Sequence, residues 1–489
     1  MATKNPSILD HYPDYALNIG IEVHVQLDTN TKIFCASDNR GCKEPNSCIC
    51  NVCAGYPGVL PVLNEKVVED AIRAGLATNC AINPVSSFAR KHYFYPDLPK
   101  GYQITQDDQP VCLQGYIPIR LEDGSIKKIR LVRIHMEEDA GKNVHASGTN
   151  ESFVDLNRAG TPLLEIVSYP DIESTYEAKA YLKALHQIVR YVGICTGNME
   201  EGAFRADTNI SVRKKDAKEL GTRCELKNIN SFKFIGDAIE YEIERQIELI
   251  ESGQKVVQQT RLWDSANKVT KAMRSKEEAA DYRYFPDPDL PLVKIDESWI
   301  ERVKKTMPEL PYNKFDRFVQ EHGLSPYEAE ILVEDKALAG YYEEARALTQ
   351  SGHLVNWLLR DLLGYLKEHK ITIDQCKVTP ERLAQLLTLL DNGTINGAAA
   401  KEIFVEVAQT GGVPADIVKA KGLEQIGSVD ELEAIVKEII AANPAQVEQY
   451  MGGKERMFGF FVGQAMKKTQ GKGNPNIIQE LLKKHLSCS

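Results

Sequence analysis

The sequence predicts an α+β protein in which an antiparallel-sheet domain precedes two all-α domains. Two observations support this fold class. Residues 17–295 alternate short strand-like runs with turns rich in Gly, Pro and Asn, whereas the residues after about 296 form a succession of amphipathic helical segments. Breaks at PDPDLP, residues 286–291, and at AQTGGVPAD, residues 408–416, separate the parts. We therefore expect a sheet domain over residues 1–295, a helical domain over 296–409 and a small helical tail domain over 410–489.

The first predicted strand, NIGIEVHVQLDT at residues 18–29, shows the pattern on which the sheet prediction depends. Its apolar residues occupy alternate positions from Ile19 to Leu27, and the polar residues Glu22 and His24 fall between them. Alternation with a period of two places the apolar side chains on one face of a strand and the polar side chains on the other. Further strands are expected at residues 113–120, 127–137, 162–168, 204–213 and 223–228, and helices at 64–79, 174–192 and 233–252.

Carboxylates recur on these strands. Glu165 interrupts the apolar run PLLEIVS, Asp207 and Glu225 lie on alternating strands beside basic residues, and the strand at 127–137 leads into a Glu-Glu-Asp triplet. A lone carboxylate in an apolar run is costly to bury unless it is paired or binds a cation. A solvated sheet face is one explanation. The recurrence favours the other, a site for Mg²⁺ and a phosphate group, because Mg²⁺ prefers carboxylate and phosphate oxygens.

The familiar nucleotide-binding motifs are absent from this sequence. It has no GxxxxGK[ST] motif, no GxGxxG between a strand and a helix, and no HRD with DFG. A nucleotide would therefore bind to an open sheet with metal-binding carboxylates. The aromatic stretches HYFYP at 92–96 and YRYFP at 282–286 could stack on adenine or on a nucleic-acid base, but core packing is the expectation for most of these rings.

The composition is that of an ordinary globular protein. The 489 residues are 43% hydrophobic and 26% charged, with a formal net charge of −10, so the chain as a whole is not a basic nucleic-acid-binding protein. The first residues lack a signal-peptide pattern, and no run of 18 apolar residues predicts a membrane span. We expect a cytoplasmic location, in which the eleven cysteines are thiols or metal ligands rather than disulfides.

Five of the cysteines lie close together in CASDNRGCKEPNSCICNVC, residues 35–53. The spacing Cys50-x₂-Cys53 is typical of a zinc knuckle. A loop with few apolar residues needs some constraint to hold its shape, which favours structural zinc over a plain loop without metal. Spacing alone does not select four ligands. Cys50 and Cys53 are the strongest candidates, followed by Cys35 and Cys42.

Capping residues mark helices in the second half of the chain. Asp296, Ser325 and Thr379 each precede an amphipathic segment, and HLVNWLLRDLLGYLKEH at 353–369 reads as one helix. Residues 451–489 contain seven Lys or Arg and two Glu, which gives a local net charge of +5. A basic end on an acidic chain suits a nucleic-acid backbone, although a solvated helix end would also explain it.

Several long motifs, in order along nearly the whole chain, resemble the B subunits of bacterial aspartyl/glutamyl-tRNA(Asn/Gln) amidotransferases. They are GIEVHVQL, GYPGVLPVLN, FARKHYFYPDLPKGYQITQ, HMEEDAGK, DLNRAGTPLLEIVS, MEEGAFRADTNIS, ELKNINSF, DYRYFPDPDLP and the C-terminal GFFVGQAMKKTQGKGNPNIIQELLKK.

The resemblance implies a sheet similar to that of glutamine synthetase and the guanidino kinases. It also implies a carbon–nitrogen ligase that takes its amide nitrogen from glutamine. ATP would phosphorylate the side-chain carboxylate of Glu-tRNA(Gln), Asp-tRNA(Asn) or both, and ammonia would then displace phosphate to give Gln-tRNA(Gln) or Asn-tRNA(Asn).

The resemblance also assigns site residues. It places Mg²⁺ at Glu22, His24, Glu138, Glu165, Asp207 and Glu225. The last four are the expected catalytic carboxylates, with Glu137 as an outer neighbour, and the residues expected to face the ATP phosphates are Lys142, Arg158, Arg205 and Lys227. Members of the family that contain zinc usually have a Cys-x-Cys pair before Cys-x₂-Cys. In this sequence Ser37 stands at the second position, so either Cys42 or Cys48 substitutes for it or the zinc site is altered.

The sequence has no serine-rich amidase motif, so another protein should release the ammonia. The resemblance implies an amidase A subunit and a small C subunit in a heterotrimer, and a tail domain that contacts tRNA. Two alternatives fit the sequence less well. A free-standing amide ligase for a small amino acid does not need the helical half with its basic end, and a non-enzymatic tRNA-binding protein does not need the carboxylates.

Overall fold

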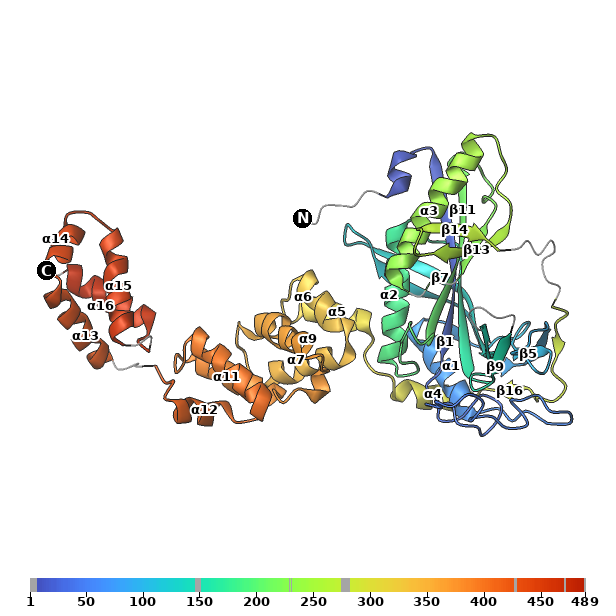
Figure 1. Cartoon of the computed structure of the whole chain (residues 1–489), viewed down its shortest axis with the longest axis horizontal. Helices are drawn as coiled ribbons and strands as arrows, with labels where there is room; N and C mark the ends of the chain where they lie inside the picture. The colour runs from blue at the N-terminus through green and yellow to red at the C-terminus, as the bar shows by residue number, and fades with distance from the viewer. Residues whose placement is uncertain are drawn as a thin grey trace. The chain divides into compact units, whose positions relative to one another are not determined.

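The computed structural model describes residues 7–145, 151–227, 229, 231–273, 282–425, 429–469 and 472–487. The contacts divide the chain into two compact units, one ending at Lys314 and the other beginning at Phe315, and each is described by itself (Figure 1). Among the described residues, no helix is both long enough and apolar enough to cross a membrane.

A nine-stranded sheet forms the centre of the first unit, with the strand order β14-β13-β12-β11-β1-β10-β7-β6-β2. All neighbouring strands are antiparallel except β12 and β13, which are parallel. The strands span Tyr15–Gln26 (β1), Ala81–Ile82 (β2), Cys112–Arg120 (β6), Ile126–Glu138 (β7), Pro162–Ser168 (β10), Phe204–Lys214 (β11), Cys224–Lys227 (β12), Gln259–Asp264 (β13) and Val269–Ala272 (β14). The mostly antiparallel sheet followed by a largely helical part confirms the predicted α+β class.

The predicted alternation is confirmed in β1 and β11. Ile19, Ile21, Val23 and Val25 are fully buried, while Glu22 and His24 between them are half-buried. The same holds in β11 from Phe204 to Ile210, where buried residues alternate with half-buried Asp207 and its polar neighbours, whereas Ser211 further along the strand is buried as well. Residue 228, the last of the strand predicted at 223–228, lies outside the described residues.

Three helices cover the apolar face of the sheet. They are α1 (Glu65–Ala77), α2 (Thr175–Tyr191) and α3 (Phe232–Glu251), and their apolar side chains share one hydrophobic core with the strands. Figure 1 shows α2 and α3 side by side along the sheet. Because these helices occupy one face, the polar side chains of the central strands are directed to the other face.

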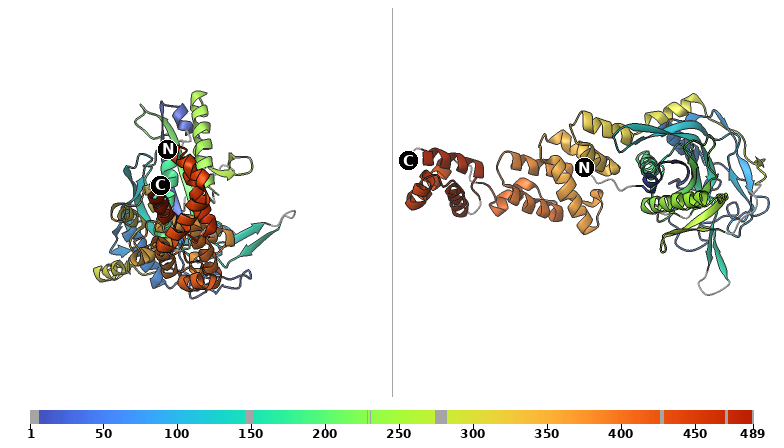
Figure 2. Two further views of the ribbon diagram at one scale, coloured as in Figure 1. Left: turned by 90° about the vertical axis from the view of Figure 1, so that its left-hand side faces the viewer. Right: turned by 90° about the horizontal axis from the view of Figure 1, so that it is seen from above.

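Three smaller sheets surround the large one. They consist of β4 (Ala89–His92), β5 (Tyr102–Thr105) and β15 (Phe285–Pro286); of β3 (Val85–Ser86) and β16 (Val293–Lys294); and of β8 (Lys142–His145) and β9 (Ser152–Asp155). The hairpin formed by β8 and β9 projects from the body of the unit (Figure 2). Helix α4 (Glu297–Lys305) also belongs to this unit, and the carboxylate of its N-cap Asp296 accepts a hydrogen bond from Trp299 N at 2.8 Å.

The second unit is helical and has two separate hydrophobic cores. The first core contains residues from Phe318 to Val418 and the second contains residues from Leu432 to Leu486. Helix α5 (Pro311–Gln320) spans the division between the two units, and the helices that follow are α6 (Pro326–Glu334), α7 (Lys336–Leu348), α8 (Leu354–Asn356), α9 (Leu363–His369), α10 (Pro380–Asp391), α11 (Gly397–Thr410), α12 (Pro414–Lys421), α13 (Val429–Ala442), α14 (Pro444–Met451), α15 (Arg456–Lys468) and α16 (Pro475–Ser487).

The predicted caps Ser325 and Thr379 are confirmed, since both side chains accept hydrogen bonds from the third residue of the following helix. The segment at 353–369 is not the single regular helix that the sequence predicts, because a π-helical stretch, Trp357–Leu362, separates α8 from α9. Its wider turn lets Trp357, Leu358 and Leu362 all be buried. The predicted domain boundaries at 295 and 409 stay predictions.

Candidate active site

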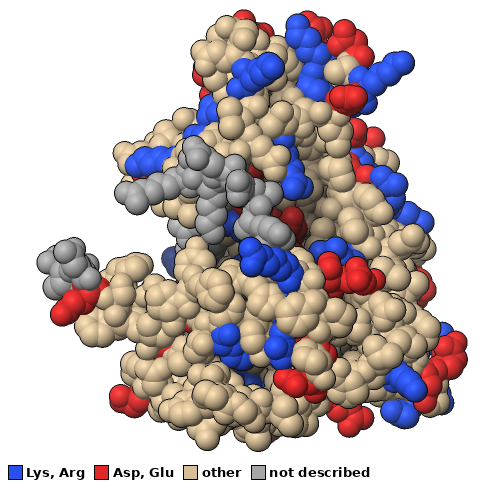
Figure 3. Space-filling model, turned by 90° about the vertical axis from the view of Figure 1, so that its right-hand side faces the viewer, with Lys and Arg blue, Asp and Glu red and all other residues tan. Residues whose placement is uncertain are grey.

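The polar face of the central strands brings together charged residues that are distant in sequence. On β1, Glu22 is the direct cross-strand partner of Asp207 on β11, and His24 lies opposite Glu165 on β10. Figure 3 shows a hollow in the surface with acidic atoms inside it and Lys or Arg side chains around it. The register of the sheet therefore brings Glu22, Asp207, His24 and Glu165 together, and all four lie on strands.

One part of the site is a cluster of several carboxylate side chains on β1, β11 and β12. Lys227 Nζ lies 2.9 Å from Asp207 Oδ2 and 3.0 Å from Glu225 Oε1. Asn209 donates a hydrogen bond to Glu22 at 3.0 Å. Burial raises the pKa of the Glu22 carboxyl, and the negative charges of Glu165, Glu225 and Asp207 raise it further. One lysine therefore faces several carboxylates, which favours the binding of a further cation.

The second part of the site pairs imidazoles with carboxylates on β1, β10 and β7. His24 Nε2 lies 3.4 Å from Glu165 Oε2 and 3.5 Å from Glu137 Oε1, and His135 Nε2 lies 3.1 Å from Glu165 Oε2. Ligand atoms of His24, Glu137 and Glu165 all lie within 4.8 Å of one another, close enough to hold one metal ion.

These contacts control the protonation of the buried groups. Burial opposes ionisation of Glu165, but His135 and His24 hold its pKa well below the usual range. Burial would also lower the pKa of His135, but Glu165 and Glu137 raise it to about 9. In the metal-free protein the carboxylate is therefore ionised and His135 is protonated at neutral pH.

Glu137 and Glu138 point to opposite faces of β7. Glu137 joins His24 on the polar face, whereas Glu138 Oε1 accepts hydrogen bonds from Lys100 Nζ and, at 2.9 Å, from Ile104 N. The structure does not bring Glu138 together with Glu165. The alternation of His135 and Glu137 with buried Ile134 and Met136 is the sequence signal that identifies Glu137 as the member of the polar face.

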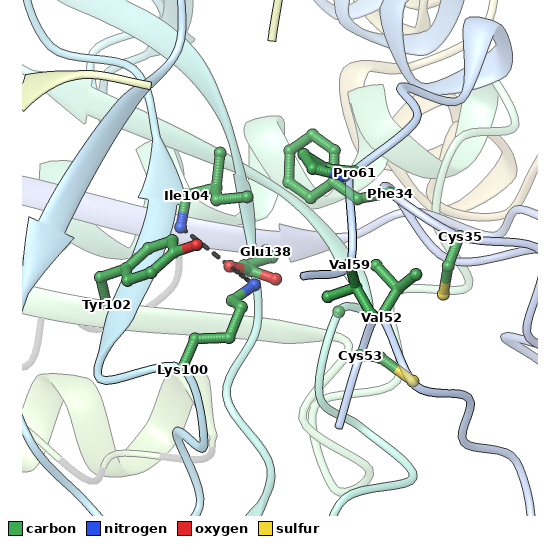
Figure 4. A pocket seen from close by; sticks show the side chains of 11 residues that line it. Phe34, Cys35, Val52, Cys53, Val59, Pro61, Lys100, Tyr102, Ile104 and Glu138 are labelled. Carbon is green, nitrogen blue, oxygen red and sulfur yellow. Dashed lines mark hydrogen bonds and ion pairs between the residues drawn. The ribbon is translucent and has the colours of Figure 1, made fainter. Parts of the chain in front are cut away.

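Glu138 lies in an adjoining pocket that also touches the cysteine-rich loop (Figure 4). Lys100, Tyr102 and Ile104 approach from one side, and the opposite wall is formed by Phe34, Cys35, Val52, Cys53, Val59, Pro61 and Gly160. A buried ion pair, Lys100 with Glu138, is thus enclosed between β5, β7 and the loop.

The four predicted phosphate-facing cations lie in three places. Lys227 stands among the carboxylates of β11 and β12. Arg205 Nη2 donates to Asp139 Oδ2 at 2.9 Å, and Arg158 Nε lies 3.6 Å from the same oxygen. Lys142 begins the β8–β9 hairpin, outside the large sheet, and is exposed. Only Lys227 and Arg205 therefore belong to the polar face itself.

Sequence reasoning missed Lys91 on β4. Its Nζ lies 4.8 Å from the ring centre of Tyr282 and 5.9 Å from that of Tyr93. Burial alone would lower its pKa, but Glu137 above all, together with Tyr284 and Glu165, raises it. An ammonium held between aromatic rings and directed toward the carboxylates is a further candidate for contact with an anionic substrate. The RKHYFYP motif contains this lysine, but the motif does not indicate that the lysine side chain is directed toward the carboxylates.

The expectation that most aromatic rings at 92–96 and 282–286 pack in the core is wrong for several of them. Phe94 is 85% exposed, Tyr95 51%, Tyr284 41% and Phe285 44%. His92 stacks on Phe285 with ring centres 4.9 Å apart, and Arg90 lies over Tyr102. The rings therefore form a surface cluster beside the polar face.

The cysteine-rich loop separates its thiols into two groups. The sulfur atoms of Cys35, Cys50 and Cys53 lie within 4.8 Å of one another. Cys42 is joined to Cys48 by a disulfide, which differs from the expectation of free thiols. The structure thus brings together three of the four predicted zinc ligands, whereas the fourth, Cys42, is bonded to Cys48.

Comparisons with known proteins cover nearly the whole chain. A family described as the GatB/GatE catalytic domain matches residues 17–301, and a GatB domain matches residues 340–486. The chain is 54% identical over 470 residues to the aspartyl/glutamyl-tRNA(Asn/Gln) amidotransferase B subunit of Trichlorobacter lovleyi, covering 96% of this chain and 98% of the relative. It is 55% identical over 476 residues to the corresponding protein of Geobacter sp. strain M21, with 96% and 99% covered, and 52% identical over 473 residues to that of Thermodesulfovibrio yellowstonii, again with 96% and 99% covered.

Proposed function

Because the chain belongs to the GatB family of aspartyl/glutamyl-tRNA(Asn/Gln) amidotransferase B subunits, we propose that it converts misacylated Glu-tRNA(Gln) or Asp-tRNA(Asn) into Gln-tRNA(Gln) or Asn-tRNA(Asn) as part of an amidotransferase. It is then a subunit of a carbon–nitrogen ligase. The observation that carries this proposal is the match to the Trichlorobacter lovleyi protein, in which 54% of the residues are identical over 96% of this chain.

The reaction has two steps in this proposal. The side-chain carboxylate of the tRNA-bound amino acid attacks the terminal phosphate of ATP, which gives an acyl phosphate and ADP. Ammonia then attacks the acyl carbon and phosphate leaves. Phosphoryl transfer of this kind depends mainly on positioning and on neutralising charge. Lys227 and Arg205 supply fixed positive charge on the polar face, and Asp207, Glu225 and Asp139 hold these two cations in place.

The donor set fits Mg²⁺. Glu22, Asp207, Glu225 and Glu165 offer hard carboxylate oxygens on one face, and the raised pKa of Glu22 reflects burial and a repulsion among these groups that a bound cation would relieve. When bound, Mg²⁺ supplies positive charge to the ATP phosphates. His24 completes this proposed set, with Glu137 beside it. For Glu138 the geometry supports a place in the adjoining pocket with Lys100 rather than beside Glu165.

The remaining parts of the proposal concern fold and partners. We propose a catalytic sheet similar to that of glutamine synthetase and the guanidino kinases over residues 1–295, a helical domain over 296–409 and a tRNA-binding tail over 410–489. Arg158 and Lys142 stay in the proposal as phosphate contacts. The partners are an amidase A subunit that releases ammonia from glutamine and a small C subunit, and the location is the cytoplasm, where aminoacyl-tRNA is used.

Reconstitution tests this proposal. The chain would be combined with an amidase subunit and a small subunit and supplied with ATP, glutamine and Glu-tRNA(Gln) or Asp-tRNA(Asn). We expect amidated tRNA, and we expect the chain to use ammonium chloride when the glutamine-hydrolysing activity is blocked. Amidation of free glutamate instead of the tRNA-bound form would support the free-standing ligase, and tRNA binding without ATP consumption would support a non-enzymatic role.

A further inference from the structure

Thr260 on β13 holds one of the carboxylates of the polar face. The strands β12 and β13 are parallel neighbours, and Thr260 lies directly beside Glu225 in their register. The hydroxyl group of Thr260 donates a hydrogen bond to Glu225 Oε2 at 2.7 Å, while Lys227 Nζ lies 3.0 Å from the other carboxylate oxygen, Oε1. Hydrogen bonds to a charged acceptor are stronger than those between neutral groups. Each oxygen of Glu225 therefore has its own partner, and together the two partners fix the direction of the carboxylate.

The strand that carries Thr260 is anchored from the opposite face of the sheet. Arg261, the next residue, is buried, and its Nε lies 3.4 Å from Oε2 of Glu242 on α3, whose side chain is fully buried. Arg261 also donates to the hydroxyl and carbonyl oxygens of Thr270 on β14, both at 2.7 Å. Helix α3 and β14 lie side by side (Figure 1). Because β13 pairs with β12 over only four residues, its position also depends on this buried ion pair.

The carboxylate that Thr260 contacts lies in a crowded acidic cluster. Burial raises the pKa of Glu22, and Glu225 is one of the three carboxylates whose negative charges raise it further. Repulsion among like charges drives a carboxylate in such a cluster toward solvent, and the Glu225 side chain is already 25% exposed. The hydrogen bond from Thr260 opposes this rotation and keeps Glu225 on the polar face. Outer groups of this kind orient metal ligands, and their loss typically lowers metal affinity about 10- to 100-fold.

We propose that Thr260 is a positioning residue of the cation site, whose hydroxyl group fixes Glu225 in the direction in which this carboxylate binds Mg²⁺. The inference rests on the proposed function, because it takes Glu225 as a ligand of the cation. A threonine that serves only the fold acts through its methyl group and its strand. A positioning threonine acts through its hydroxyl group, and only while Glu225 is present. The two roles therefore predict different results for the same substitutions.

Manganese binding to the full-length chain tests the role of the hydroxyl group. Mn²⁺ prefers the same oxygen ligands as Mg²⁺, and electron paramagnetic resonance measures the free ion. Thr260→Val, which keeps the shape of the side chain and removes the hydroxyl group, should weaken Mn²⁺ binding about tenfold or more. Thr260→Ser, which keeps the hydroxyl group, should bind Mn²⁺ within about twofold of the unaltered chain. Thr388→Val, which removes a hydroxyl group from α10 in the second unit, is the matched control and should leave the affinity unchanged. Thr260→Ala gives the same comparison with Thr260→Ser if Thr260→Val does not fold.

A double-variant cycle tests whether Thr260 acts through Glu225. In the Glu225→Gln background, Thr260→Val should change the affinity for Mn²⁺ by less than about twofold, because the carboxylate that it orients is gone. Equal losses in both backgrounds, or a Thr260→Ser variant as weak as Thr260→Val, would show that the threonine is structural and overturn the inference.

The same titrations separate this inference from the proposed function. Unchanged Mn²⁺ binding by Thr260→Val, in a chain whose unaltered form binds the ion and whose Glu225→Gln form binds it more weakly, would overturn the role of Thr260 alone. Absence of Mn²⁺ binding by the unaltered chain would overturn the proposed cation site, and the role of Thr260 with it.

Discussion

His24 on β1 and Glu165 on β10 are direct cross-strand partners, and His24 Nε2 lies 3.4 Å from Glu165 Oε2. His135 on β7 is the partner of Glu165 on its other side, and its Nε2 reaches the same oxygen at 3.1 Å. One carboxylate is thus shared by imidazoles from both neighbouring strands. Any change at Glu165 should therefore alter the charge of the whole polar face. Three predictions concern this face and the pocket beside it, and a fourth concerns the C-terminal helices.

The first prediction concerns the carboxylates. Glu165→Gln or Asp207→Asn should lower ATP-dependent phosphorylation of the aminoacyl-tRNA by at least about 100-fold, because each removes an oxygen charge from the proposed Mg²⁺ site. Folding and tRNA binding should change little. The measurement is acyl phosphate formation or ADP release in the assembled complex. Asp264→Asn is a matched control, since Asp264 lies on β13 of the same sheet and pairs with Lys271 at 2.6 Å. Full activity of the Glu165 variant would rule out its assignment.

The second prediction concerns pH. The pKa of His135 is raised to about 9 in the folded chain, so protonated His135 stabilises the fold below its unfolded pKa of about 6.5, and this contribution is lost as the pH rises through 9. In the presence of a metal chelator, the stability advantage of the unaltered chain over His135→Gln should shrink by on the order of 3 kcal/mol between these pH values. Denaturant unfolding at several pH values measures it. A constant difference would show that His135 is neutral in the fold.

The third prediction concerns the buried pair of Lys100 and Glu138. Their side chains are 13% and 4% exposed, so Lys100→Met should leave an unpaired buried carboxylate and lower the free energy of unfolding by about 3 kcal/mol or more. The double variant with Glu138→Met should recover much of this loss, because no buried charge is left unpaired. Denaturant unfolding of the single and double variants gives the coupling energy. Additive losses would mean that the two groups do not interact.

The fourth prediction concerns the tail. Helix α12 packs in the first core of the second unit through Ile417 and Val418, so a truncation should begin after residue 425 and remove only the helices from α13 onward. The shortened chain should bind tRNA more weakly, because the removed segment contains exposed Lys454, Lys467 and Lys483. ATP hydrolysis by the sheet domain should remain.

Salt dependence separates a phosphate contact from a structural effect of the tail. Lys454→Gln or Lys467→Gln should each reduce the slope of log affinity against log salt by roughly 0.7 to 0.9 if the lysine contacts a phosphate. Filter binding of tRNA at several salt concentrations measures the slope. Unchanged affinity and slope in the truncated chain would place tRNA recognition elsewhere in the protein.

The features that were predictable from the amino-acid order alone are those set by local periodicity and local hydrogen bonds. Alternation in β1 and β11 predicts which face of each strand is buried, because the side-chain period of a strand is fixed at two. The caps Asp296, Ser325 and Thr379 were predictable because an N-cap side chain bonds to its own helix. The long motifs predict the family, which comparison over 96% of the chain confirms.

Other features emerge only in the folded chain, because they depend on which strands become neighbours. Alternation along β7 separates Glu137 from Glu138, but the contact of Glu137 with His24 depends on the register between β1, β10 and β7, and no local pattern contains that register. The burial of Lys32 against Cys53 depends on the fold of a loop without periodicity. Cys42 has the spacing of a zinc ligand but is bonded to Cys48, because the path of the loop, and not the spacing of its cysteines, determines which sulfur atoms meet.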